Sequence, residues 1–334
     1  MNTGEIIKRI RQSNGYTQDE MAQKLFVTRQ AVSRWENGET LPNIDTLRII
    51  SRIFEVPINN LVDVKALSGG ANGEINAQRF IGFADVYDNN RPTVPKQAVD
   101  IIEGYLGSAP ESVVDLGCGT GLSVMAWSGH CDNITGVDPS DDMLAVARLR
   151  ETEQIRFIKA FSHATGLPDG YADVVICSQS FHWMNPQDTL SEVDRILRKG
   201  GVFAAVDCDW PPVSSLKAEM AYSTLFNKVR LIEEENADIH RTFNRWDKSE
   251  HLCNIRASGY FRYSREIVFS STEPCDAERF IGLAQSQGSL QTILKLHPEL
   301  IEKDYLHFRK AVFEAFENEQ GEVTFCYRMR IGVK

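Results

Sequence analysis

The amino-acid sequence predicts an α/β fold with an open, mostly parallel sheet, preceded by a small all-α module. Three observations predict it. An apolar strand at 113–116 runs into three glycines at alternate positions, Gly117, Gly119 and Gly121, and then into a helix from about Leu122. Apolar, β-branched runs alternate with helical stretches as far as residue 206. Before residue 67, the pattern is instead that of short, capped helices.

Composition limits the class of protein. At 334 residues the chain is long enough for two domains. Seven cysteines are scattered without C-x-x-C pairs, which indicates reduced thiols and predicts neither a disulfide framework nor a metal site. No apolar run approaches the ~20 residues that span a bilayer, and the start does not resemble a signal peptide. We therefore expect a cytoplasmic protein without a membrane partner.

Charge is divided unevenly along the chain. Residues 1–67 hold nine Lys and Arg against eight Asp and Glu, whereas the remainder holds 27 against 38. An acidic body disfavours a catalytic domain that follows a nucleic-acid backbone. Any contact with nucleic acid should therefore come from the first segment.

The first segment reads as a compact helical module. Helices are expected at 5–12, at 18–25 after the N-cap Thr17 with its capping-box partner Glu20, and at 29–36 after the N-cap Thr28. Asn37 and Gly38 close the third helix. A fourth helix is expected at 44–54 and a fifth at 58–61.

This segment resembles the helix-turn-helix domain of phage repressors and the XRE family, through Tyr16-Thr17-Gln18, Val27-Thr28, Ser33–Gly38 and Pro42. The resemblance implies that the third helix enters the major groove of double-stranded DNA, and that the protein acts as a homodimer on a two-fold site. A module for dimerisation or protein binding stays open as the alternative. The residues implied to contact DNA are Gln18, Thr28, Arg29, Gln30, Ser33, Arg34 and Asn37.

A flexible linker should separate the two domains, because residues 66–73 contain three glycines and few apolar anchors. The expected division is a DNA-binding domain at 1–67, a linker at 68–76 and a second domain at 77–334. That second domain should have a core at 77–208 and helical lid insertions at about 209–258 and 272–320.

The glycine spacing indicates the kind of ligand. A dinucleotide fold has G-x-G-x-x-G, whereas here Asp115 opens D-x-G-x-G-x-G. Asp138 follows 23 residues later, at the end of the next apolar run. A carboxylate at the tip of the second strand can bind the two hydroxyls of a ribose. Without these later residues, the glycines alone would also fit a tight strand-to-helix turn.

These motifs resemble those of the class I S-adenosylmethionine-dependent methyltransferases, which have a Rossmann-like seven-stranded sheet. Tyr87 and Arg91, in Y-x-x-x-R-P, resemble the entry of the branch that includes the trans-aconitate type, although Val94 replaces its second aromatic. The resemblance implies S-adenosyl-L-methionine as cofactor, with Arg91 near its methionine carboxylate. The implied cofactor-binding residues are Tyr87, Arg91, Asp115, Gly117, Cys118, Gly119, Gly121, Asp138, Pro139, Met143, Phe161, Ser162, Ser178 and Gln179.

The remaining strands are expected at 155–160, 172–177, 202–206, 262–269 and 323–331, the last one antiparallel. The fourth strand ends near His182-Trp183, where acceptor chemistry is expected. Core packing of both side chains is the alternative. The implied acceptor-site residues are His182, Trp183, Trp246 and Ser286, with Phe243, Gln285 and Gln287 as further candidates.

Methyl transfer needs alignment and exclusion of water, and it needs a base only when the nucleophile arrives protonated. A carboxylate acceptor needs none, and a phenol or an amine could use His182 or His163. We expect an enzyme that methylates oxygen or nitrogen of a small molecule. A transcriptional regulator that senses S-adenosylmethionine without turnover is the alternative, and a DNA methylase is disfavoured by the acidic body.

Overall fold

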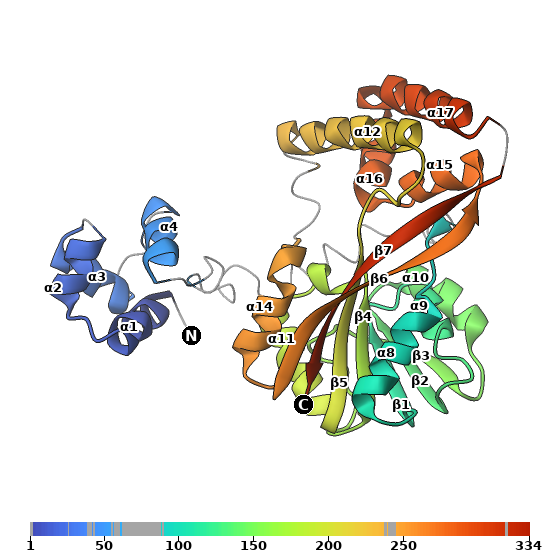
Figure 1. Ribbon diagram of the computed structural model, residues 1–334. Coiled ribbons are helices and arrows are strands. Elements are labelled where there is room, and N and C mark those ends of the chain that lie inside the picture. Colours follow the sequence, from blue (N-terminus) through green and yellow to red (C-terminus); the bar gives the residue numbers. More distant parts are fainter. Residues whose placement is uncertain are drawn as a thin grey trace. The chain divides into compact units, whose positions relative to one another are not determined.

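The computed structural model describes residues 3–25, 27–38, 42, 44–54, 56, 61, 88, 90–236, 239, 245–317 and 320–334. The chain divides into two compact units, Met1–Asn72 and Gly73–Lys334, which are described one at a time (Figure 1). Within the described part, no helix has the length and apolarity to cross a membrane. The expected linker, Tyr87 and Phe243 lie outside the described residues, as does the helix at 58–61 except for Leu61.

The described part of the first unit contains four helices at the expected places. They are α1 (Thr3–Ser13), α2 (Gln18–Lys24), α3 (Arg29–Glu36) and α4 (Ile44–Ile53). The predicted caps are confirmed, because Thr17 and Glu20 form a capping box and the Thr28 side chain accepts a hydrogen bond from the Ala31 amide. The apolar faces of the helices meet in one small core that includes Ile7, Met21, Leu25, Val32 and Ile50.

A buried ion pair ties three of these helices together. Arg11 donates from Nε and Nη2 to the two carboxylate oxygens of Glu36, at 2.5 and 3.0 Å. Gln18 adds a third hydrogen bond to Glu36, at 2.9 Å. Burial raises the pKa of Glu36, but the bonds from Arg11 and Gln18 outweigh it, so this pKa lies below its usual value. The pair therefore stabilises the unit as long as Glu36 is ionised.

The second unit is a seven-stranded sheet with the order β3-β2-β1-β4-β5-β7-β6. The predicted fold class is confirmed. Strands β3, β2, β1, β4 and β5 run parallel, and β7 is antiparallel to both of its neighbours. The strands are β1 (Ser112–Leu116), β2 (Asn133–Asp138), β3 (Ile155–Lys159), β4 (Ala172–Ser178), β5 (Leu197–Cys208), β6 (Tyr263–Cys275) and β7 (Gly321–Val333).

Helices cover both faces of this sheet (Figure 1). Alternate residues of β1 point to opposite faces, so Val113 packs in one core cluster and Val114 in another. The first cluster includes residues of α8 (Lys96–Leu106), α9 (Leu122–Met125) and α10 (Asp141–Ala147). The second includes residues of α11 (Pro186–Ile196) and α14 (His251–Ser258).

Four further helices gather at one end of the long β6–β7 ribbon (Figure 1). They are α12 (Leu216–Glu235), α15 (Ala277–Gln285), α16 (Gly288–Leu296) and α17 (Glu302–Phe316). The first core cluster continues from the sheet into these helices, through Tyr222, Phe280 and Phe308. The lid is therefore part of the same hydrophobic core as the sheet.

Several expected boundaries are wrong. Strand β6 continues to Cys275, so the second lid insertion cannot begin at 272 and starts after the strand instead. Strand β6 is this long because it pairs with β7 along the whole length of β7. Strand β5 already begins at Leu197 and not at Val202. Local sequence did not indicate these lengths because cross-strand pairing and packing determine them.

We predict that Glu36→Gln destabilises the first unit by ~3 kcal/mol, because it leaves Arg11 buried without its counter-charge. Asp19→Asn is the matched control. It breaks an exposed pair of 3.7 Å with Arg29, so its cost should stay below ~1 kcal/mol. Amide hydrogen exchange of residues 3–38 in the full chain measures both changes. Equal protection in the two variants would contradict the role assigned to the buried pair.

Candidate functional site

The candidate site lies where four parallel strands end. Strands β1, β2, β4 and β5 finish at Leu116, Asp138, Ser178 and Cys208. Because they run parallel, their carboxyl ends lie at one edge of the sheet, where open α/β sheets bind ligands. The glycine-rich segment leaves β1 at this edge.

The turn after β1 is held tightly against β2. The amides of Gly117 and Cys118 both donate to the carbonyl of Val137, at 2.7 and 3.1 Å. Gly117 has a φ of 68°, and a Cβ there would lie 2.7 Å from side-chain carbons of Ser180 and Met184. Only glycine fits this position, for reasons of both conformation and space.

Asp138 at the tip of β2 is bound to the turn. Its two carboxylate oxygens accept from the amides of Gly119, at 2.9 Å, and Ser140, at 2.8 Å. Burial raises its pKa to about 6, although these two hydrogen bonds favour the ionised form. Ser140 also caps α10, which places Met143 in the core beside the site.

Asp115 in β1 lacks one hydrogen-bond partner. It is completely buried, and one carboxylate oxygen accepts from the Ser123 hydroxyl. The other oxygen, Oδ1, has none within the described part of the chain. Burial raises its pKa to about 7, and the nearby charge of Asp138 adds to this effect. A buried acceptor without a donor is costly, so the site favours a ligand that brings one.

A narrow cleft opens beside this turn. Five of the residues expected to bind the cofactor line it together, namely Arg91, Gly117, Cys118, Ser178 and Gln179. Ser123 and Tyr327 also line the cleft, and sequence reasoning missed both. Phe161 and Ser162 are not among its lining residues. Ser162 shares a hydrogen bond of 2.9 Å with Thr189, and Phe161 stacks on His163.

Arg91 joins the cleft to the lid. Its guanidinium lies over the Trp210 ring at 5.0 Å and donates to the Ser286 carbonyl at 3.0 Å. The Ser286 side chain is completely buried and donates to Leu283 inside its own helix. The hydroxyl therefore faces its own turn, and the carbonyl is the group that contacts Arg91; the role of Ser286 at the acceptor stays a prediction.

His182 lies just after β4, in η3 (Phe181–Trp183). Its ring is buried and lies 4.7 Å from the Trp183 ring. Burial, and then the charges of Lys248 and His251, hold its pKa well below the usual value. The Trp246 amide donates to the His182 carbonyl at 2.8 Å, so this contact of Trp246 is made by its main chain and not by its ring.

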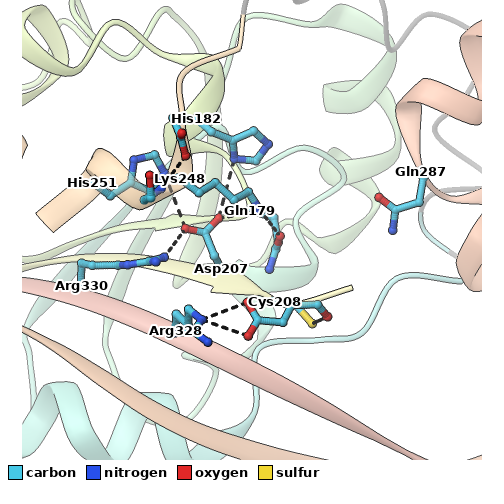
Figure 2. A network of polar contacts seen from close by, with 12 residues as sticks. Gln179, His182, Asp207, Cys208, Lys248, His251, Gln287, Arg328 and Arg330 are labelled. Carbon is cyan, nitrogen blue, oxygen red and sulfur yellow. Dashed lines mark hydrogen bonds and ion pairs between the residues drawn. The ribbon is translucent and has the colours of Figure 1, made fainter. Parts of the chain in front are cut away.

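A network around Asp207 adjoins His182 (Figure 2). Lys248 and Arg330 each contact the Asp207 carboxylate at 2.9 Å, and His251 lies 3.6 Å from it. Burial lowers the pKa of His251 to about 4. Sequence analysis missed all four residues. The rule that selected Asp138, an acid at the end of an apolar strand, would also have selected Asp207.

The same network contains three side chains with atoms that can bind a metal ion. These atoms of His182, Asp207 and His251 lie within 4.8 Å of one another. However, Lys248 and Arg330 already neutralise the carboxylate, and a divalent ion would add positive charge beside both of them. The arrangement therefore suits an internal ion-pair network better than a metal centre.

The expected DNA-contacting residues divide into two groups. Thr28, Arg29, Gln30, Arg34 and Asn37 are exposed along α3 and its ends, and Ser33 is half-buried. Val32 and Trp35 face the core instead. Gln18, expected to reach a phosphate, already binds Glu36.

Comparison with known families divides the chain in the same way. A family described as a methyltransferase domain matches residues 114–205, and a helix-turn-helix family matches residues 7–61. A protein of Saccharomyces cerevisiae, named a probable S-adenosylmethionine-dependent methyltransferase, is 33% identical over 124 residues, which are 35% of this chain and 43% of that protein. An uncharacterised methyltransferase of Mycobacterium tuberculosis is 32% identical over 122 residues, 36% of this chain and 49% of that protein.

The helix-turn-helix part is similar to BcrR, a transcriptional activator of Enterococcus faecalis, with 36% identity over 67 residues, 20% of this chain and 33% of that protein. The chain spans about half the length of the curated methyltransferases it matches. A solved structure from Anaeromyxobacter dehalogenans, provisionally described as a type II methyltransferase, has a TM-score of 0.58 at 18% identity and covers 73% of this chain and 97% of that one. At this identity the likeness is one of fold.

We predict that Asp115→Asn stabilises the chain more at pH 8 than at pH 4. The pKa of Asp115 is raised from 3.8 to about 7 on folding, so the native state loses stability as pH rises between these values. The amide cannot ionise, and the difference between the two pH values should reach ~2 kcal/mol or more. Denaturant unfolding at both pH values measures it. If the variant were less stable than the parent by the same amount at both pH values, the assignment of Asp115 as a buried carboxyl with an unpaired oxygen would be refuted.

Proposed function

We propose that the chain is an S-adenosyl-L-methionine-dependent methyltransferase of a small molecule with a sequence-specific DNA-binding domain, because residues 114–205 match a methyltransferase family and residues 7–61 match a helix-turn-helix family. S-Adenosyl-L-methionine is the cofactor of this domain family and supplies a methyl group activated by a positively charged sulfur. The acceptor atom is an oxygen or a nitrogen, and carboxylates belong to the candidates.

The observation that carries this proposal is the unpartnered Oδ1 of Asp115 beside the glycine turn. The cofactor contains an ammonium group, which is the kind of donor this oxygen lacks. Asp138 lies at the tip of the neighbouring strand, where its carboxylate would hold the ribose hydroxyls. Arg91 and Gln179 line the cleft beside the glycine turn and would orient the remainder of the cofactor. The residues present therefore fit the group.

The arrangement of the lid supports the proposal that the methyl acceptor is a small molecule. Arg91 connects the cleft to the turn between α15 and α16, and the aromatic rings of Trp210 and Tyr222 stack beneath it at 6.4 Å. An enclosure of this kind keeps water away from the transferred methyl group. His182 would accept a proton whenever the acceptor's nucleophilic atom carries one.

The DNA-binding proposal rests on the exposed side of α3. Arg29, Gln30 and Arg34 project from it, and arginine and glutamine have the donor geometry to bind guanine and adenine edges. A two-fold site read by a homodimer would follow from this geometry.

We predict that labelled methyl groups pass from S-adenosylmethionine to a small molecule, and that Asp138→Ala abolishes both this transfer and calorimetric binding of S-adenosylhomocysteine. Binding to the parent should weaken as pH falls through about 6, because the Asp138 carboxylate then becomes protonated. Asp141→Asn is the control, since Asp141 is exposed and pairs with Lys159 at the surface.

Two outcomes would go against this function. If the parent takes up neither cofactor nor product, the methyltransferase proposal fails. If it binds the cofactor, changes its affinity for DNA and methylates nothing in a wide panel, the domain is a sensor of the cofactor instead.

For the DNA-binding domain, we predict that Gln30→Ala and Arg34→Ala each weaken binding to DNA selected from a random pool by ~1–3 kcal/mol. Arg9→Ala removes an exposed charge from α1 and should change affinity much less. Fluorescence anisotropy at two salt concentrations measures these values. Equal losses in all three variants would show that no base edges are read at these positions.

A further inference from the structure

Asp207 is the centre of a buried charge network beside the cofactor cleft. It lies near the end of β5, with its side chain 4% exposed. Lys248 contacts Oδ1 and Arg330 contacts Oδ2, both at 2.9 Å. Lys248 also donates to Gln179 at 3.2 Å, a residue with the left-handed φ of 54° that lines the cofactor cleft. The network thus connects the ends of β4 and β5 with the interior of β7.

One nitrogen of the His182 ring, Nδ1, faces this network. It lies 3.7 Å from Asp207 Oδ1, which is too far for a hydrogen bond. The same nitrogen is buried and has no hydrogen-bond partner among the described residues. Because an unpaired buried nitrogen is unfavourable, the geometry points to a second state in which this contact is shorter.

A carboxylate that faces Nδ1 determines where the ring carries its proton. It favours the N–H at Nδ1 and leaves the lone pair at Nε2. Figure 2 shows one ring nitrogen directed at Asp207 and the far edge of the ring turned toward the side on which Gln287 lies. Gln287 belongs to the lid and contacts Arg91 of the cofactor cleft. The free lone pair at Nε2 therefore lies on the ring edge that is turned away from Asp207.

The competing cation can move away. Lys248 occupies the carboxylate oxygen that faces His182, and its side chain is 34% exposed, in contrast to the 6% of Arg330. When His182 gains a proton, its Nδ1–H can form a charge-assisted bond to Oδ1 as Lys248 turns to solvent. Arg330 stays on the other oxygen and keeps the carboxylate in place.

We propose that Asp207 is a positioning residue that makes His182 the proton acceptor, and that the methyl acceptor is therefore a hydroxyl or N–H compound rather than an already ionised carboxylate. This inference rests on the proposed function. The electron pair of the O–H or N–H bond forms the new bond to the methyl carbon, the proton passes to His182 Nε2, and the pair of the broken carbon–sulfur bond remains on sulfur. The proton then leaves His182 for water.

The charges around His182 agree with this role. Burial lowers its pKa most, and Lys248 from η4 (Lys248–Glu250), His251 from α14, and the arginines Arg245 and Arg91 lower it further, so the ring is neutral at neutral pH. Asp207 and Arg330 complete the charged groups on this side. Removal of Lys248 should therefore raise the pKa of His182, whereas removal of the Asp207 charge should not.

Nitrogen-detected NMR of the histidine-labelled full chain tests the positioning without any cofactor. The His182 signals are assigned by comparison with His182→Gln. We expect the parent ring to be protonated at Nδ1, Asp207→Asn to shift the proton toward Nε2, and Lys248→Met to raise the His182 pKa. Asp209→Asn is the matched control, because this carboxylate pairs with Arg328 and should leave the ring unchanged. A parent ring protonated at Nε2 would overturn the proposal.

Turnover provides the second measurement. Acceptors are offered in matched pairs, phenol with benzoate and cyclohexanol with cyclohexanecarboxylate. The hydroxyl member should be methylated, and Asp207→Asn should reduce its kcat at least ~100-fold with an unchanged KM for the cofactor. Methylation of the carboxylates alone, or an unaffected kcat in Asp207→Asn, would overturn the proposal.

Two further comparisons distinguish a loss of folding from a loss of function. The double variant Asp207→Asn, Lys248→Met removes both members of one ion pair, so it avoids an unpaired buried lysine if the single variant unfolds. It should show the same loss of kcat and the same tautomer shift as the single variant. A parent that transfers no methyl group at all would refute the proposed function, and the NMR result would still decide the positioning by Asp207.

Discussion

The shared carboxyl edge of four parallel strands is the constraint on which the candidate site depends. Parallel pairing of β1 with both β2 and β4 brings Asp115, Asp138 and Gln179 to one edge, although they are far apart in the sequence. The hydrogen bond from the Gly119 amide to Asp138 then fixes the glycine turn to the neighbouring strand. If this register slipped by one residue, the carboxylates would face the opposite side of the sheet.

Three buried carboxylates at this edge are stabilised in three different ways. Asp138 accepts two main-chain amides, Asp207 pairs with two cations, and Asp115 has one oxygen without a donor. Burial of a carboxylate is costly unless hydrogen bonds or counter-charges compensate it. The three carboxylates therefore differ in how fully hydrogen bonds and counter-charges compensate their burial. Asp207 is held firmly, and Asp115 is the group that most requires a ligand.

Local patterns predicted much of this site and failed in specific places. Glycine spacing and strand-end acids identified the cofactor turn, because both depend on residues close together in the sequence. The direction of the Ser286 side chain could not be predicted, because only the tertiary structure shows that its hydroxyl bonds to the Leu283 carbonyl. Lys248 and His251 belong to a stretch whose local pattern does not show which distant strand end they meet. Arg330 lies in β7, where a charged residue gives no indication of the partner that it meets across the strands.

The sequence by itself determined the two-domain plan, the fold class, the caps of the first unit and the motif that indicates a nucleotide-like cofactor. These features follow from conformational preferences and hydrophobic periodicity, which act over a few residues. Only the tertiary structure decided which distant charges meet, such as Arg11 with Glu36 and Asp207 with Lys248. Contacts of this kind depend on strand order, register and the path of the lid, and the packing of the whole core sets these together.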